Sequence, residues 1–487
     1  MKNKVGKYLI ITLLLLLGLC CVGVLYLFFV PGSNLFGITY ISYSRHYKAN
    51  GFSISKVSTV VVNSYNYDVK ILPTKEEEIY IDVYNNSFGF VMQQNKDVVL
   101  VPELKYGTLT FDISEPSGFS LNNNSTISLY IPEKSELNLK LTNNGALTTI
   151  SSNSLKINNF NYSTNYGALK LESCKILGDI DLDLNDATCI INSDVETNEN
   201  NLTLSIKRGK LEALDSVFNS VNVKSNARGV IKLNICKDIE MLSKTAGGRI
   251  EINQVQTGKI KTSDTNVNIT EVTIGIIIDL TKSGNVTIAN ILNEVQEGSK
   301  AITTTISTVD GNIKIDRCMA SAMLQSTHGN ISVNNAYLTI DTKNVYGNIY
   351  VNFANDAESY ADNSSARTFI SINKNGKTTC IGTDHASVSI DKTGVGSANI
   401  TFNEVHGNNN FTSDTGTFIV KVNKTSIFNL KILTTSGNVK ANLTQSPVYG
   451  GWTDKEIDEF INCNSSSNII DIKSVSGSIT VLDSNFY

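Results

Sequence analysis

Residues 311–351 read GNIKIDRCMASAMLQSTHGNISVNNAYLTIDTKNVYGNIYV and carry the clearest sign of the fold. It contains one element three times at intervals of 18 residues: a glycine, an asparagine, and then alternating apolar and polar residues. The copies begin at Gly311, Gly329 and Gly347. Alternation places successive side chains on opposite faces of a strand, so Ile or Val points inward and Lys or Ser outward. The stretch therefore predicts short strands joined at glycine corners.

The same element returns through most of the chain at a spacing of about 20 residues, which is typical of a stacked array. The sequence thus predicts an all-β fold, a single-stranded parallel β-helix (β-solenoid) of roughly 16 coils. Residues 57–150 would form its N-terminal β-rich part and residues 151–487 its repetitive part. Glycine at each corner would supply either a positive φ or a close backbone approach. Further copies begin at Gly145, Gly167, Gly209, Gly229, Gly248, Gly284, Gly396, Gly416, Gly437 and Gly477.

The segment 453–463 departs from this pattern. Thr453 followed by Glu456 reads as a capping box, and Ile457, Phe460 and Ile461 follow at helical spacing. These residues predict a short helix that caps an open solenoid edge. The spacing from Gly437 to Gly477 is 40 residues, which we interpret as two consecutive periods.

The N-terminus carries the main apolar segment. Residues 8–30 read YLIITLLLLLGLCCVGVLYLFFV and contain no charge, so they are long enough to cross a bilayer. A cleaved signal peptide is the alternative, although its apolar stretch is usually shorter and ends in small residues. Lysines at positions 2, 4 and 7 place residues 1–7 in the cytoplasm as a short tail and the C-terminal domain in an extracellular or lumenal space. Residues 31–56 would form a linker or stalk.

Composition limits the classes of partner. Charged residues make up 18% of the chain and the net charge is −4, while Asn, Ser and Thr are abundant. The sequence contains no cluster of basic residues, so nucleic acid is not expected as a partner.

Residues 57–150 resemble the opening of a known family. A β-rich opening is followed by an acidic turn and a second strand, two further alternating segments come next, and the glycine repeats then begin. This order is similar to the bacterial and protist "putative adhesin" family of β-solenoid domains. The resemblance implies a solenoid fold and an adhesion role, and it supplies no catalytic residues. The segments that carry it are 60–63, 69–71, 76–83, 107–111 and 127–132.

Few residues suggest chemistry. Cys174 and Cys189 could form a disulfide between neighbouring coils, or both could be isolated buried thiols. The acidic stretch 178–186 lacks the glycine and the final acid of a calcium loop, so we interpret it as a solvated face and expect no metal or cofactor. Possible N-glycosylation sites are Asn85, Asn161, Asn201, Asn268, Asn363, Asn399, Asn410, Asn423 and Asn442.

These observations favour a non-enzymatic, single-pass membrane protein used for cell-surface adhesion or ligand display. Its partner would be a surface glycan or protein of unknown identity. One alternative is a glycan-active enzyme of the lyase or hydrolase kind, which would need paired acids on one face. Another is a structural envelope protein that associates with itself.

Overall fold

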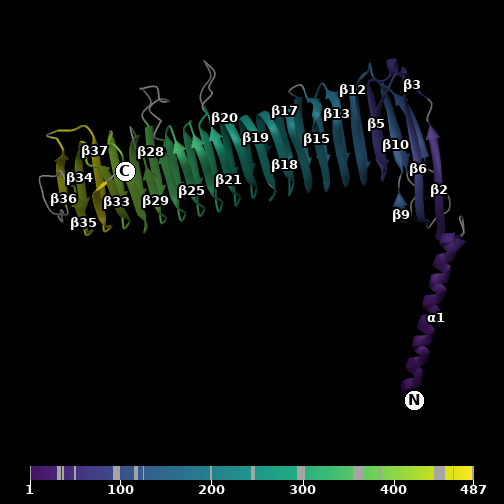
Figure 1. Ribbon diagram of the computed structural model, residues 1–487, viewed down its shortest axis with the longest axis horizontal. Helices are drawn as coiled ribbons and strands as arrows, with labels where there is room; N and C mark the ends of the chain where they lie inside the picture. Colours follow the sequence, from purple (N-terminus) through teal and green to yellow (C-terminus); the bar gives the residue numbers. More distant parts are fainter. Residues whose placement is uncertain are drawn as a thin grey trace. The chain divides into compact units, whose positions relative to one another are not determined.

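In the residues that it describes, the computed structural model is all-β apart from one long N-terminal helix (Figure 1) and one short 3-10 helix. The all-β prediction is therefore confirmed. The structure describes residues 2–29, 34–35, 38–48, 51–91, 99–114, 119–123, 125–197, 200–242, 247–292, 302–354, 367–382, 386–443, 456–463 and 465–484.

The chain divides into two compact units, Met1–Ser216 and Val217–Tyr487. The first unit begins with helix α1 (Lys2–Phe29). Within it, Gly6–Tyr26 is long and apolar enough to cross a membrane, and its side chains pack against nothing. Both a membrane anchor and a signal sequence fit these properties.

The strands of the first unit form two ladders of mostly parallel pairs. One ladder runs β8, β4, β11, β12, β14, β16 and the other runs β6, β10, β5, β12, β13, β15, β17. The elements are β1 (Asn34–Leu35), β2 (Ile38–Lys48), β3 (Phe52–Ser53), η1 (Ile54–Lys56), β4 (Thr59–Tyr65), β5 (Asp68–Thr74), β6 (Glu78–Val91), β7 (Val99–Lys105), β8 (Thr108–Ser114), β9 (Phe119–Asn123), β10 (Thr126–Pro132), β11 (Glu136–Asn144), β12 (Ala146–Thr164), β13 (Gly167–Ile176), β14 (Ile180–Leu184), β15 (Ala187–Thr197), β16 (Asn200–Ile206) and β17 (Gly209–Asn226).

Two predictions about this unit are corrected. Residues 31–56 are not a plain linker, because β2 pairs along its length with β6. The opening is also not purely parallel, since β6 runs antiparallel to β2, β9 and β10, and β7 runs antiparallel to β8. Of these pairs, only β7 and β8 form a local hairpin, with the two residues 106 and 107 between them. The strands that pair with β6 lie far from it in the chain, so local alternation does not reveal their direction.

The strands of the second unit also form two ladders, and each strand from β20 to β31 pairs in parallel with the strand two positions further along the chain. The elements are β18 (Val230–Leu242), β19 (Arg249–Thr262), β20 (Asn266–Leu280), β21 (Val286–Ile291), β22 (Thr304–Thr308), β23 (Ile313–Cys318), β24 (Ala322–Ser326), β25 (Ile331–Ala336), β26 (Ile340–Asn344), β27 (Ile349–Phe353), β28 (Arg367–Asn373), β29 (Thr378–Ile381), β30 (Ala386–Lys392), β31 (Ser397–Phe402), β32 (Asn408–Ser413), β33 (Thr417–Asn423), β34 (Phe428–Thr434), β35 (Val439–Asn442), β36 (Glu456–Ile461), β37 (Ile469–Ser474) and β38 (Ile479–Ser484).

The core consists of the inward-facing residues of these strands. Ile313 and Ile315 are 1% and 0% exposed, and Lys314 between them is exposed. Ile331 and Val333 occupy the same inward positions one coil further on and are equally buried. We use "coil" for two successive strands and the corner between them. Identical aliphatic columns repeat from coil to coil, which is how short strands with a two-residue period bury a continuous apolar core.

The helix predicted at 453–463 is wrong, because β36 is a strand antiparallel to β34. Ile457 and Ile461 are buried in it, while Phe460 is 42% exposed. An open sheet edge leaves a row of unpaired N–H and C=O groups, and β36 satisfies them along β34. Pairing with the edge of β34 therefore stabilises a strand here more than the spacing of three apolar side chains stabilises a helix.

A polar corner as candidate functional site

The corners of the second unit are built on glycine because neighbouring backbones come very close. A Cβ on Gly329 would overlap the carbonyl oxygen of Gly311, and a Cβ on Gly347 would overlap that of Gly329. Gly284 adds a positive φ of 137°. At Gly311, Gly329 and Gly347 the close backbone approach explains the glycine, and the alternative explanation, a positive φ, does not apply there.

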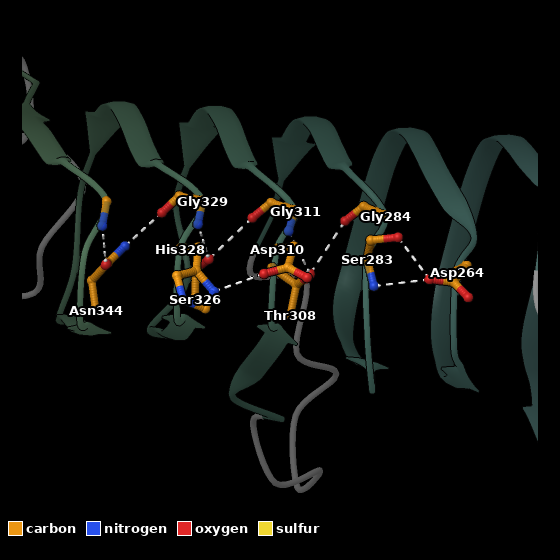
Figure 2. Close-up of polar contacts among 11 residues, drawn as sticks. Asp264, Ser283, Gly284, Thr308, Asp310, Gly311, Ser326, His328, Gly329 and Asn344 are labelled. Atoms are coloured by element: carbon orange, nitrogen blue, oxygen red, sulfur yellow. Dashed lines mark hydrogen bonds and ion pairs between the residues drawn. The ribbon is translucent and has the colours of Figure 1, made fainter.

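A row of buried polar side chains supports each corner from inside (Figure 2). Ser326 Oγ accepts from Gly329 N at 2.9 Å and donates to the Gly311 carbonyl of the preceding coil at 3.1 Å. Asn344 repeats the arrangement with Gly347 N and the Gly329 carbonyl, both at 2.6 Å. Each side chain thus satisfies one donor and one acceptor that the corner would otherwise leave buried and unpaired. The corner is rigid as a result.

Lys392 occupies the same inner row further along. It pairs in register with Ser413, and its predecessor in the row is Asn373. Its side chain is 0% exposed, and Nζ donates to the Gly376 carbonyl oxygen. Burial lowers the pKa of Lys392 to about 8, because desolvation disfavours the ammonium form.

Two rows of side chains lie on the outside of the same corner, all of them exposed except Asp264 and Ser283, which are partly exposed. We call the two rows together the corner strip. The residue before each corner gives the first row, and the residue after it gives the second. The first row is Asp264, Ser283, Asp310, His328 and Tyr346, and the second is Asn266, Asn285, Asn312, Asn330 and Asn348.

The asparagine row is held by a repeated hydrogen bond. Asn312 N donates to Asn285 Oδ1 at 2.9 Å, Asn330 N to Asn312 Oδ1 at 2.8 Å, and Asn348 N to Asn330 Oδ1 at 2.9 Å. Each side-chain oxygen is therefore used within the protein. The Nδ2 groups belong to exposed side chains and repeat at the spacing of the strands, about 4.8 Å, and that of Asn312 also donates to Asn285 Oδ1 at 3.3 Å.

The first row mixes acids, a hydroxyl and rings. Ser283 donates to Asp264 Oδ1 from its N at 3.1 Å and its Oγ at 2.6 Å, and these bonds lower the pKa of Asp264. His328 Nδ1 lies 2.7 Å from Asp310 Oδ1. The His328 ring also stacks on Tyr346, with centroids 5.0 Å apart and planes 3° from parallel. Contacts between successive coils therefore fix the orientation of these exposed groups.

This arrangement can bind a ligand along its length. It offers amide donors, carboxylate acceptors and the polar edges of two rings in parallel rows. A hydroxyl-rich chain lying along the strip would meet alternating donors and acceptors at each coil. Among the residues that the structure describes, no cluster of three or more His, Cys, Asp or Glu side chains could hold a metal ion.

The two cysteines predicted as a possible pair are separate free thiols. Cys189 pairs in register with Leu169, and Cys174 lies five residues further along that strand, beside Val195. A disulfide needs Cα atoms within roughly 7 Å, so this register does not allow the bridge. Burial raises the pKa of the Cys174 thiol to about 12, and that of Cys189 is also raised. The alternative of isolated buried thiols describes the structure.

The predicted glycosylation sites fall into groups of different exposure. Asn201, Asn410 and Asn442 are exposed, and Asn161, Asn268, Asn399 and Asn423 are partly exposed. Asn85 lies in strand β6, and Asn363 lies outside the described residues.

The acidic stretch 178–186 stays on the surface. Asp181 and Asp183 are exposed on β14 and line a shallow hollow of about 220 Å³ with Lys140. Asp186 pairs with Arg208 at 2.5 Å, and Asp179 accepts from Asn201 Nδ2 at 3.0 Å. These partners fit the interpretation as a solvated face.

Sequence reasoning missed the first row of the corner strip. None of Asp310, His328 and Tyr346 stands out by itself in the sequence. A signal existed, because all three immediately precede a repeat glycine. Aligning the repeats on that glycine would have placed them in one row.

Comparisons with known proteins are distant. No family model matches the chain, and no curated protein matches it. A solved structure described as a "putative cell adhesion protein" from Clostridium sporogenes has 8% identity and a TM-score of 0.15, covering 91% of this chain and 100% of that one. A "putative adhesin" from Bacteroides fragilis has 12% identity and a TM-score of 0.22, covering 66% of this chain and 99% of that one. Similarities of this size carry no argument about function.

Proposed function

We propose that this chain is a membrane-anchored, non-enzymatic β-solenoid that binds a hydroxyl-rich polymer, such as a surface glycan, along its corner strip. The single observation that carries the proposal is the strip itself. Its two rows run in register through successive coils, and contacts between the coils fix their side chains. A repeated set of weak contacts favours a repeated ligand, because each added coil raises the effective concentration for the next contact.

The location follows from the same proposal. Helix α1 would remain uncleaved as the anchor, with residues 1–7 in the cytoplasm and the coils outside or in a lumen. In a host that glycosylates, carbohydrate would be added at exposed sequons such as Asn201 and Asn410. N-terminal sequencing of the mature protein from membranes should find the intact N-terminus. Cleavage after α1 would reject the anchor.

Binding is tested with the full chain in lipid nanodiscs on an array of glycans and surface proteins. The variant Asp310→Ala, His328→Ala, Tyr346→Ala removes exposed groups from the strip. We expect it to lose at least about ten-fold in affinity for any polymer that the unmodified chain binds, equal to about 1.4 kcal/mol.

The matched control is Met323→Ala, Gln325→Ala, Lys343→Ala, which changes three exposed side chains of β24 and β26 away from the strip. It should bind like the unmodified chain. Equal binding by the strip variant and the unmodified chain would contradict the proposal. Turnover of a bound polysaccharide would instead favour a glycan-active enzyme.

A further inference from the structure

The last coil of the chain lies out of sequence order. Strand β38 pairs with β33 on one side and β35 on the other, and β37 lies between β32 and β34 in the same way. The corners agree with this order, because a Cβ on Gly477 would overlap the Gly416 carbonyl and a Cβ on Gly437 would overlap that of Gly477. Residues 469–484 are therefore inserted between two coils that precede them in the chain. The prediction of two consecutive periods from Gly437 to Gly477 is wrong.

The path into this position passes around β34. Strand β36 covers its outer edge, with Glu456 opposite Leu433, and β37 covers its inner edge. The turn between them crosses the connection from β33 to β34. Asn462 Nδ2 holds the crossing by donating to the carbonyls of Lys424 at 2.9 Å and Ser426 at 2.8 Å. Strands β36 and β37 thus pair with both edges of β34.

The inserted coil and its two neighbours use interchangeable contacts. Ser413, Ser474 and Thr434 each accept a hydrogen bond from the glycine nitrogen three residues later, at 2.6, 2.9 and 2.9 Å. On the inward side Phe411, Ile472 and Ile432 form one column, and Phe418, Ile479 and Val439 form another. The position between β32/β33 and β34/β35 thus requires a coil of this pattern, and nothing in these contacts restricts it to the same molecule.

The connection is long enough for exchange. Between β35 and β37 the chain has 26 residues, 443–468, only part of which forms β36. Fully extended, such a segment spans about 85 Å at roughly 3.3 Å per residue. Exchange between copies replaces each contact with an identical one, so its equilibrium cost is small once the segment has opened.

We propose that residues 465–484 form an exchangeable segment, and that the segment of one copy inserts between β32/β33 and β34/β35 of a second copy. Reciprocal insertion gives a closed dimer, and one-way insertion gives a chain of copies. The partner is a second copy of this chain, because only the same repeat pattern restores both ladders and the inner polar row. This inference does not depend on what the corner strip binds.

A mixing experiment tests the exchange. Thr412 and Lys473 are exposed neighbours in register, at a parallel-strand spacing that suits a disulfide. Full-length chains carrying Thr412→Cys alone and Lys473→Cys alone, with Cys20, Cys21 and Cys463 changed to Ser, are mixed in nanodiscs or detergent. They are incubated near the onset of thermal unfolding, cooled and oxidised. We expect a disulfide-linked heterodimer whose yield rises with protein concentration.

The matched control uses Thr305→Cys mixed with Met323→Cys, which are neighbours in consecutive coils that follow chain order. This mixture should give no heterodimer above background. The absence of heterodimer from the Thr412 and Lys473 mixture would overturn the proposal, provided that the double variant forms the disulfide within one molecule. Equal dimer in both mixtures would also overturn it, because exchange would then not be specific to the last coil.

A truncation gives a second readout. Asn410 and Lys431 are separated by the inserted Asp471, so their Cα atoms lie about two strand spacings apart, roughly 10 Å. In a chain ending at residue 464, β34 can pair directly with β32. The variant Asn410→Cys, Lys431→Cys should then form an internal disulfide when truncated and none when full-length. A truncated chain without this disulfide would show that the neighbouring coils cannot replace the insert, against the proposal.

Discussion

The coils from Thr304 to Phe353 and those from Asn408 to Ser484 have the same side-chain chemistry but a different chain order. In the first group, the sequential coils, β22–β27 stack in the order in which they are synthesised. In the second group, the inserted coils, β37 and β38 lie between coils that precede them. The contacts between coils therefore specify which coils can stack but do not specify their order along the chain.

The largest expected difference between the two groups comes from the corner glycines. Gly329→Val and Gly477→Val each place a side chain onto a neighbouring carbonyl oxygen. For Gly329 we expect a loss of more than about 4 kcal/mol in the free energy of unfolding, because coils on both sides must separate. For Gly477 we expect only the last coil to open.

Hydrogen exchange measures this difference. Gly477→Val should lose protection in residues 465–484 and keep it in β23 and β25. Gly407→Ala is the control, because its Cβ would meet only Ser387 at 3.7 Å and its φ of 59° alone should cost about 1–2 kcal/mol. If Gly477→Val unfolded both groups together, the inserted coils would not be an independent unit.

The next largest effect is a pH dependence of stability that arises from Lys392, which precedes the inserted coils in the chain. Its pKa falls from 10.5 to about 8 on folding, so the unfolded chain binds more protons between these values. Stability should therefore rise with pH across that window, and the burial penalty should be fully present below about pH 8. Its neighbours in the inner row, Asn373 and Ser413, are neutral.

Denaturant unfolding at pH 7.5 and pH 10.5 checks this prediction against Lys392→Asn. Between pH 7.5 and pH 10.5, the free energy of unfolding of the unmodified chain should rise by up to about 3 kcal/mol more than that of the variant. Asparagine is a matched replacement because Asn344 and Asn373 occupy the same row. A pH dependence shared by both proteins would mean that Lys392 is not the titrating group.

A smaller effect is expected from the buried hydroxyls. Ser326→Ala and Ser474→Ala each leave the nitrogen of a corner glycine without its partner, which costs about 1–3 kcal/mol. We expect similar losses in the free energy of unfolding, measured by denaturant unfolding, because both hydroxyls accept a hydrogen bond from the glycine nitrogen three residues later at 2.9 Å. The second bond differs, since Ser326 donates to Gly311 of the preceding coil and Ser474 donates to Gly477. Ser332→Ala, on the outward side of β25, should change stability by less than about 0.5 kcal/mol. A much smaller loss at Ser474 would indicate that the inserted coil adds little to global stability.

The smallest effect concerns the outer asparagine row. Asn330→Ala removes one exposed side-chain acceptor for Asn348 N and should cost about 0.5–1 kcal/mol. The control is Gln325→Ala, an exposed change on a strand outside the strip. Equal stabilities of the two variants in denaturant unfolding would show that this row orients side chains for binding without stabilising the coils.

Sequence patterns predicted what depends on near neighbours. Alternation gave the strands and their buried faces, as at Ile313 and Ile315, and the run 8–30 gave the apolar helix. The same local reasoning failed at 453–463, because it did not include the unpaired edge of β34. It also missed that Asp310, His328 and Tyr346 share a row, since these residues are 18 apart.

Local sequence is enough to specify β-strands with glycine corners, because side-chain alternation acts within a few residues. Which strand lies beside which is set by contacts between residues far apart in the chain. Coils of one pattern can stack in more than one order with similar contacts, so the choice depends on connections and edges that lie far apart in the chain. Three features depend on such distant contacts: the antiparallel pairing of β2 with β6, the pairing of β36 and β37 with the two edges of β34, and the insertion of the last coil.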